Sequence, residues 1–457
     1  MVAVSFFRIF LYKVVGSFMI RNSNILTLAV GLLLFFFLFG SFFCSKPGGL
    51  GDKDILVWVS YGPDEYKLFE KIAKNWSELK GNDYKVHVAL IPWMGQESKY
   101  RTALIAGAPP DIGRVDTPFV PELAHNNVLT DIKQYLTAEE TEKKMNTGEI
   151  LLEYVKAAID SCVIKDKNGV EHVYGFPDQT NGACLFYNKD SFKAAGLDPE
   201  KPPKTWDEFI EYAKKLTKPD EGLYGFGMDN SLWWSFPFFN TFGTKFLSDD
   251  GAKCLLDSKE GVAALQMKVD IYKKYAVEGG AWKSGGQNTE TGFINGRYAM
   301  ILMGPWNLSR FKAARVNFGV ALVPEGPAGT STNVGGTNMV IFRNERRPAA
   351  KLRACYDFLR YVTSPDVQAE WASTLRQIPV NLKAYDKFRI DDKEEEQKLK
   401  IFMEQMKTAQ ARPKVLKYAQ LETIINPEME SALSGNITVE KALGNAVERI
   451  NREVLAH

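Results

Sequence analysis

The chain has 457 residues, of which 45% are hydrophobic, 25% charged and 12% aromatic, and its formal net charge at pH 7 is +2. This composition is typical of globular proteins and excludes a disordered, collagen-like or coiled-coil chain, and at roughly 100–200 residues per domain the length predicts two or three domains. Because positive and negative charges nearly cancel, the sequence offers no basic field for a phosphate backbone, and we expect no nucleic-acid partner.

The first fifty residues have the pattern of a targeting segment. Residues 25–43 are nearly all apolar, follow the basic residue Arg21 and run into Cys44. A basic start, an apolar stretch and a cysteine before a polar tether are similar to a bacterial lipoprotein signal, with Met1 or Met19 as the start.

Two alternatives stay open for this segment. Its apolar run is about long enough to span a bilayer as an uncleaved anchor, and cleavage without lipidation would release a secreted protein. All three interpretations place the rest of the chain outside the cytoplasm. We predict a signal segment over residues 1–43, lipidation of Cys44, a tether over residues 44–53 and a body in the periplasm or cell envelope, held to the membrane by its N-terminus.

Strands and helices alternate in the next part of the chain. Residues 55–59 form a short apolar run typical of a buried strand, and residues 85–91 predict a second strand. Apolar residues recur at three- and four-residue spacings between Tyr66 and Trp76, which predicts a helix, and another helix is expected around residues 98–106. This alternation predicts a parallel sheet covered by helices.

Further strands and capped helices follow. A strand is predicted to begin at Asp111, and two more at residues 173–177 and 183–187. Thr205 and Glu208 form a capping box that opens a helix over residues 207–216. The last hundred residues are predicted to be mostly helical, with another N-capped start at Thr438.

Motifs of catalysis and metal binding are absent from the sequence. It contains no GxGxxG, GxxxxGK[ST], HExxH or GxSxG pattern, and its four histidines are scattered. Cys162, Cys184, Cys254 and Cys355 form no CxxC pair, so we predict no metal site and no cofactor, and we favour buried free thiols over the alternative of one disulfide. No enzyme activity is predicted, although the 55 acidic residues leave a glycosidase-like carboxylate pair open.

Several aromatic residues stand beside turn-forming residues rather than in the middle of helical patterns. They are Tyr61, Trp93, Trp233, Trp234, Trp282 and Trp306. An aromatic face can stack on the C–H face of a pyranose while neighbouring polar side chains bond the hydroxyl groups. The alternative is that these rings fill the core, and the sugar-pocket interpretation needs further support.

Four segments supply that support, because they occur in register over some 400 residues. They are residues 104–112 (LIAGAPPDI), 174–209 with the motifs YGFP, LFYNKD and KTWDEF, 293–306 (FINGRYAMILMGPW), and 318–366 with FGVALVP and GGTN. These segments resemble the family 1 extracellular solute-binding proteins of ABC importers, the group that contains maltose-binding protein. The resemblance implies an α/β fold of the periplasmic-binding-protein-like type II, with two α/β lobes joined by crossing strands and a ligand cleft between them.

The resemblance also implies lobe boundaries and ligand contacts. Lobe 1 would comprise residues 54–180 plus 337–375, and lobe 2 residues 183–334 plus 376–457. Trp306 matches the family's stacking position, and Trp233, with Trp234 as an equal choice, lies where maltose-binding protein has a stacking aromatic. Further contacts are implied for Ser60, Tyr61, Asp116, Thr117, Asn181, Gly336, Thr337 and Arg376.

The function that the resemblance implies is solute capture for import. The chain would be a monomeric substrate-binding subunit that holds a sugar or oligosaccharide and delivers it to a membrane permease, which works with an ATPase. The same fold could instead bind glycerol phosphate, with Arg114 and Arg376 as the candidate phosphate contacts, or a polyamine or another small solute such as a chelated metal. A carbohydrate-active enzyme or a sugar sensor is the alternative class, and the sequence leaves the sugar and its length open.

Overall fold

The computed structural model describes residues 50–166 and 168–456. The segments Met1–Asp52 and Lys53–His457 form separate units, and the predicted signal segment over residues 1–43 and the lipidation site Cys44 lie outside the described residues. Within the described part of the chain, none of the helices combines the length and apolar character needed to cross a membrane.

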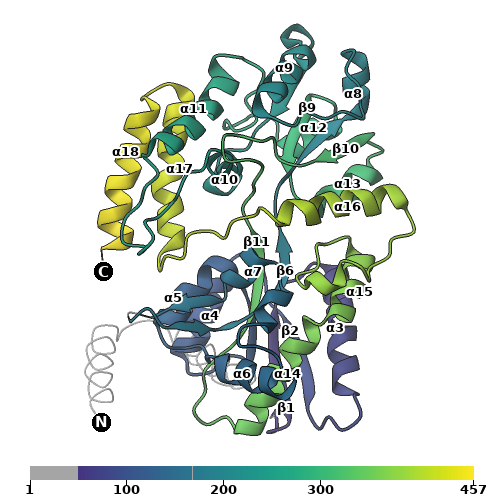
Figure 1. The fold of residues 1–457 in the computed structure, drawn as a ribbon, viewed down its shortest axis with the longest axis vertical. Helices are drawn as coiled ribbons and strands as arrows, with labels where there is room; N and C mark the ends of the chain where they lie inside the picture. Colours follow the sequence, from purple (N-terminus) through teal and green to yellow (C-terminus); the bar gives the residue numbers. More distant parts are fainter. Residues whose placement is uncertain (1–49, 167, 457) are drawn as a thin grey trace, which may run out of the picture. The chain divides into compact units, whose positions relative to one another are not determined.

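A five-stranded sheet organises the first part of the unit Lys53–His457 (Figure 1), with strand order β2-β1-β3-β11-β6. β1 (Asp54–Val59) is parallel to β2 (Lys85–Leu90) and to β3 (Ile112–Asp116), which confirms the predicted parallel arrangement. β11 (Gly335–Ile341) is antiparallel to both β3 and β6 (Gly175–Asn181). The sheet is therefore mixed, because β11 arrives from a distant part of the chain rather than through a strand–helix–strand connection.

Helices cover both faces of this sheet. One face packs against α3 (Pro63–Ser77), α14 (Ala349–Val362) and α15 (Pro365–Leu375), and its core contains alternate residues of β1 with Phe69 of α3. The other face packs against Tyr100 of α4 (Gln96–Ile105). Glu65 in the first turn of α3 accepts a hydrogen bond from the Gly62 N–H at 2.8 Å, so the sequence Gly-Pro-Asp-Glu fixes the start of this helix.

A second sheet of four strands has the order β10-β7-β9-β8. β7 (Cys184–Asn188) is antiparallel to β9 (Tyr298–Met303) and to β10 (Phe318–Ala321), and β8 (Tyr224–Gly227) is parallel to β9. The longer helices of this part are α9 (Trp206–Leu216), α10 (Leu232–Thr241), α11 (Lys259–Lys273), α16 (Lys393–Met406), α17 (Tyr418–Ser434) and α18 (Val439–Ile450).

Short elements complete the described chain. A two-stranded sheet pairs β4 (Val163–Lys165) with β5 (Glu171–Val173). Further α-helices are α5 (Val120–His125), α6 (Lys133–Glu142), α7 (Lys156–Asp160), α8 (Lys189–Ala194), α12 (Thr289–Ile294) and α13 (Leu308–Ala313).

The chain passes between the two sheets through β6 and β11, which lie side by side (Figure 1). β6 ends only three residues before β7 begins, and Gly335 at the start of β11 pairs with Asn181 at the end of β6. We interpret the two sheets as the centres of the two predicted lobes. Val380, beyond the predicted end of lobe 1, is buried in the core of the first sheet.

Local sequence signals agree with the observed helix starts. The Thr205 hydroxyl accepts from the Glu208 N–H at 3.2 Å, and α9 begins one residue earlier than predicted. The Glu208 carboxylate accepts from the Lys204 N–H at 2.7 Å, so the second half of the capping box is displaced by one residue. Thr438 caps α18 as predicted. The four cysteines Cys162, Cys184, Cys254 and Cys355 are buried and free, which confirms the favoured interpretation and excludes a disulfide among them.

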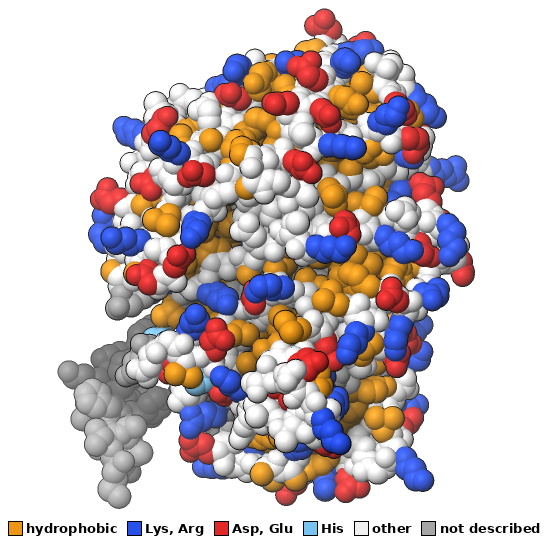
Figure 2. Space-filling view, viewed as in Figure 1, with side chains coloured by type: hydrophobic (Ala, Val, Ile, Leu, Met, Phe, Trp, Pro, Cys, Tyr) orange, Lys and Arg blue, Asp and Glu red, His pale blue; other side chains and the backbone are white. Residues whose placement is uncertain are grey.

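The surface carries charges of both signs. Figure 2 shows Lys and Arg side chains interspersed with Asp and Glu over the visible face of the described chain. This arrangement agrees with the near-zero net charge of the sequence.

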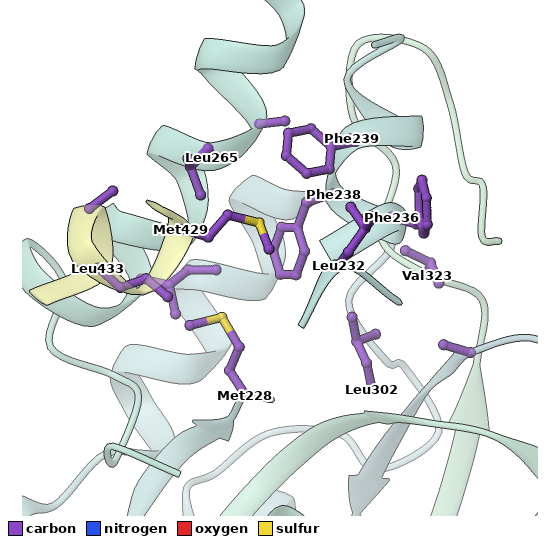
Figure 3. Close-up of a cluster of buried hydrophobic side chains, with 14 of the residues drawn as sticks. Met228, Leu232, Phe236, Phe238, Phe239, Leu265, Leu302, Val323, Met429 and Leu433 are labelled. Atoms are coloured by element: carbon purple, nitrogen blue, oxygen red, sulfur yellow. The ribbon is translucent and has the colours of Figure 1, made fainter. Parts of the chain in front are cut away.

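The core beside the second sheet contains an unpredicted buried lysine. Apolar side chains of α10, α11 and α17 meet there (Figure 3), and Lys268 of α11 has no exposed surface. Its ammonium donates to Asn230 Oδ1 at 3.0 Å and to Ser235 Oγ at 2.6 Å. Burial lowers the pKa of Lys268 to about 7, although the carboxylates of Asp229 and Glu278 act in the opposite direction.

We expect Lys268 to make stability depend on pH. Between pH 7 and pH 10 the unfolded chain keeps a proton on this lysine that the folded chain releases, so stability rises with pH in that window. Lys268→Met has no titrating group at this position and lacks this contribution. From pH 7 to pH 10 the free energy of unfolding of the wild type should therefore increase by on the order of 4 kcal/mol more than that of the variant. Urea unfolding at stepped pH measures the difference. Lys259→Met changes an exposed lysine on the same helix and is the control. Its free energy of unfolding should change with pH as that of the wild type does. The same pH dependence in Lys268→Met and wild type would contradict the prediction.

Candidate functional site

A cavity of about 860 Å³ is lined by residues from both sheets. The first sheet contributes the segment after β1, the end of β3, the end of β6 and the start of β11, and the second sheet contributes the beginning of α10 and the loop after β9. Pockets of this size, with an apolar lining and a few polar groups, are typical of small-molecule sites.

A buried ion pair lies beneath the cavity. Asp178 Oδ2 accepts from Arg114 Nε at 2.8 Å and from the Tyr61 hydroxyl at 2.7 Å, and Asp178 Oδ1 accepts from Thr337 Oγ1 at 2.9 Å. Arg114 also donates to the Ser60 carbonyl at 2.6 Å. The Arg114 and Asp178 side chains are only 4% and 1% exposed. Because every bond joins a different strand or loop, this network fixes the polar floor of the cavity.

Tyr61 is held in one position and one protonation state. Its ring lies 4.1 Å from the Arg114 guanidinium and packs against Phe69 and Trp371 at 5.2 and 5.4 Å between ring centroids. Burial raises the pKa of Tyr61 well above its ordinary value, and the Asp178 carboxylate raises it further. The hydroxyl therefore stays protonated and donates to Asp178.

A second layer of polar side chains leads from the ion pair into the cavity. Arg114 donates to Gln179 Oε1, and Gln179 Nε2 donates to Gln377 Oε1 at 2.6 Å and to Glu65 Oε1 at 3.2 Å. Gln377 Nε2 donates to the same Glu65 oxygen at 2.5 Å. Glu65 and Gln179 also line the cavity, so this hydrogen-bonded network forms part of its wall.

Three tryptophans form the opposite wall. Trp233 and Trp234 lie in the first turn of α10 with ring centroids 4.5 Å apart at an interplanar angle of 80°. Trp306 follows β9 and lies 5.8 Å from Trp233 and 6.3 Å from Trp234. A Cβ at Gly304 would come within 1.9 Å of the Trp306 ring, so the Gly-Pro-Trp sequence lets this ring fold back over the backbone. Trp306 stays 44% exposed, with surface available for stacking.

Arg412 connects the two walls. It lies in the segment between α16 and α17, and its Nη2 donates to Asp116 Oδ1 at 2.7 Å and to Thr117 Oγ1 at 2.5 Å at the end of β3. The Arg412 side chain is 9% exposed. The two cations that line the cavity in the described chain, Arg114 and Arg412, are thus each paired with a carboxylate.

Most of the residues that the resemblance implied lie together. Nine of them line the cavity: Ser60, Tyr61, Asp116, Asn181, Trp233, Trp234, Trp306, Gly336 and Thr337. Thr117 lies behind Asp116 and contacts Arg412 rather than the cavity. Arg376 ends α15 outside the cavity lining, because its guanidinium donates to the Ser373 carbonyl at 2.6 Å and to Glu395 at 3.3 Å.

Sequence reasoning missed part of the polar wall. Glu65, Asp178, Gln179 and Arg412 were not singled out, and Arg114 was considered only as a phosphate contact. Gln179 and Asp178 lie two and three residues before the expected ligand contact Asn181, which was the available signal. No local pattern marks Arg412. Within the described part of the chain, no group of three or more His, Cys, Asp or Glu side chains is arranged to hold a metal ion.

Comparison with known proteins connects this site to one family. A family model described as bacterial extracellular solute-binding protein matches residues 68–401. The sn-glycerol-3-phosphate-binding periplasmic protein UgpB of Pectobacterium atrosepticum is 28% identical over 300 residues, which cover 61% of this chain and 66% of that protein. UgpB of Brucella abortus is 28% identical over 298 residues, covering 62% and 67%. The chain thus aligns with about two thirds of the length of these curated relatives.

Solved structures share the fold. The cyclic α-maltosyl-1,6-maltose binding protein of Arthrobacter globiformis has a TM-score of 0.75 and 24% identity, covering 88% of this chain and 99% of that one. An ABC transporter solute-binding protein of Thermotoga lettingae bound with α-D-tagatose has a TM-score of 0.69 and 28% identity, with the same coverage. The sugar-binding protein MalE of Xanthomonas citri has a TM-score of 0.74 and 22% identity, covering 87% and 96%. These matches confirm the predicted α/β fold of the type II periplasmic binding proteins.

We expect the ion pair beneath the cavity to be required for stability. Asp178→Asn keeps the shape of the side chain but leaves the buried Arg114 charge uncompensated, which should lower the free energy of unfolding by about 3–5 kcal/mol. Urea denaturation measures this loss. The control is Asp83→Asn, which breaks the exposed pair of Asp83 with Lys53 and should change stability little. A loss below 1 kcal/mol for Asp178→Asn would show that Arg114 finds other compensation.

Proposed function

The chain belongs to the bacterial extracellular solute-binding proteins, and on that premise we propose that it captures a neutral sugar or oligosaccharide for an ABC importer. The arrangement of the cavity carries this proposal. Three tryptophans form one wall, and the other wall presents hydroxyl, amide and carboxylate groups beside Trp93. A sugar needs both kinds of surface, because its C–H faces stack on aromatic rings and its hydroxyl groups bond to polar side chains.

The paired charges argue for a neutral ligand. A phosphate would be held by cations with free donors. Arg114 already donates to Asp178, to the Ser60 carbonyl and to Gln179. Arg412 is paired with Asp116 through Nη2, and its Nε has no hydrogen-bond partner among the described residues. Glu65 adds a carboxylate to the same cavity. An anionic ligand would have to displace one of these carboxylates or accept a negative neighbour.

Glycerol phosphate is the second candidate. The curated relatives are named for sn-glycerol-3-phosphate, and Arg412 lines the cavity. The solute-binding protein of Thermotoga lettingae, which was solved with α-D-tagatose, supports the sugar at the same 28% identity over a larger share of the chain.

Capture depends on contacts with both walls. The two walls belong to different sheets, so a ligand that touches both favours the conformation in which the walls are close together. The closed protein would deliver its ligand to a membrane permease that works with an ATPase. The family consists of binding proteins, and in this proposal the chain acts as a monomer and catalyses no reaction.

The N-terminal segment would keep the protein close to its permease. Members of this family are extracellular or periplasmic. The basic and apolar pattern before Cys44 supports a signal over residues 1–43 with lipidation of Cys44, and an uncleaved anchor would have the same effect. In both cases a short tether holds the binding unit at the membrane.

A ligand screen tests the proposed function. We expect one class of saccharide to raise the melting temperature, since a ligand at 100 times its Kd stabilises a protein by about 2.7 kcal/mol. Trp306→Ala should weaken the affinity for that saccharide at least about tenfold, because it removes a stacking surface. Trp282→Ala is the matched control, since Trp282 packs against Tyr272 outside the cavity.

Differential scanning fluorimetry followed by calorimetric titration would provide these measurements, with sn-glycerol 3-phosphate and spermidine as competing ligand classes. Stabilisation by glycerol phosphate alone would overturn the choice of a sugar and would require one arginine pair to open. Stabilisation by spermidine alone would assign the carboxylates Glu65 and Asp116 to a cationic ligand.

A further inference from the structure

Trp93 stands apart from the other tryptophans of the chain. Eight of the nine tryptophans have another aromatic ring within about 6 Å, and Trp93 is the exception in the described part of the chain. No cation stacks on its ring and no hydrogen bond to its indole N–H is found among the described residues. Its side chain is 51% exposed, yet it lines the cavity.

The loop that carries Trp93 is anchored at both ends. The loop joins β2 to α4, and the Ile91 N–H donates to the Val59 carbonyl at 2.8 Å. The Gln96 N–H donates to the Trp93 carbonyl at 3.2 Å, and the Gln96 side chain is buried with its Oε1 accepting from the Ser60 hydroxyl at 3.4 Å. The exposed indole is therefore presented by a fixed backbone, which lowers the entropy lost when a ligand covers it.

Trp93 and Trp306 lie on opposite walls of one cavity. Trp93 belongs to the wall of the first sheet, next to the half-exposed Leu90, and Trp306 belongs to the wall of the second sheet. Both indoles are about half exposed. The cavity volume of about 860 Å³ lies near the upper end of the usual range for small-molecule sites, so there is room for more than one sugar ring.

We propose that Trp93 is a second stacking platform and that the ligand is an oligosaccharide, with one sugar ring on Trp306 and another on Trp93. This inference rests on the proposed sugar function and specifies the length of the ligand. In this proposal Trp93 selects for chain length, because the cavity of about 860 Å³ has room for a second sugar ring that would contact Trp93. A second sugar ring that covers the exposed Trp93 indole removes apolar surface from water and adds one stacking contact.

The test compares saccharides of increasing length on matched variants. The saccharide class identified by the screen is titrated calorimetrically as its mono-, di-, tri- and tetrasaccharide against the wild-type chain, Trp93→Ala and Met94→Ala. Met94 is the control because it is the adjacent residue, is 89% exposed and does not line the cavity. We expect wild-type affinity to rise with length. Trp93→Ala should weaken binding of the longer saccharides about tenfold and leave the monosaccharide within twofold, while Met94→Ala matches wild type.

The outcomes separate this inference from the proposed function. A monosaccharide that binds the wild-type chain as tightly as the longer saccharides would overturn the inference and leave the sugar function standing. The same holds if Trp93→Ala changes the affinity for all lengths equally or for none. If no saccharide binds the wild-type chain while glycerol phosphate or spermidine does, the proposed function fails and the role of Trp93 fails with it. Conservative rescue by Trp93→Tyr, with partial recovery for the longer saccharides only, would confirm stacking.

Discussion

The buried pair of Arg114 and Asp178 is the interaction on which the site depends. Arg114 stands on β3 and Asp178 on β6, and β11 separates these two strands in the sheet. Asp178 also accepts from Tyr61 after β1 and from Thr337 on β11. The Asp178 carboxylate thus connects four segments of the first sheet, namely β3, β6, β11 and the segment after β1. Two charges so thoroughly buried are stable only when both stay paired, so these segments can shift only together.

The two walls of the cavity are held in place in different ways. The polar wall is rigid, because its side chains bond to one another through Gln179, Glu65 and Gln377 before any ligand arrives. The aromatic wall depends on backbone features instead, namely the close approach allowed at Gly304 and the first turn of α10. A ligand that joins the walls must supply the energy for closure through contacts with both of them. A ligand that contacts only one wall would bind without favouring closure.

The sequence predicted the parts of the structure that have a local cause. Helix starts at Thr205 and Thr438 follow from capping side chains, and the buried strand at residues 55–59 follows from its apolar run. Trp233 and Trp306 were expected as ligand contacts because they stand beside turn-forming residues and lie where one family has stacking aromatics, and the structure places both in the aromatic wall. The polar wall was not predicted, since Asp178 and Arg412 are separated by more than 200 residues from each other and resemble any other charged residue. Antiparallel β11 was missed for the same reason, as it is set by contacts between distant segments.

Selectivity in this cavity follows from charges that are already paired. Binding a neutral sugar leaves the pairs Arg114–Asp178 and Arg412–Asp116 intact, and the sugar hydroxyl groups bond to the remaining polar atoms. Binding a phosphate at Arg114 would leave Asp178 without its cation in a position that is 1% exposed, and burying an unpaired carboxylate is strongly unfavourable. Arg412 is less deeply enclosed, with Asp116 at 25% exposure. An anionic ligand would therefore have to enter at Arg412, and the Arg114 side of the cavity would stay reserved for neutral groups.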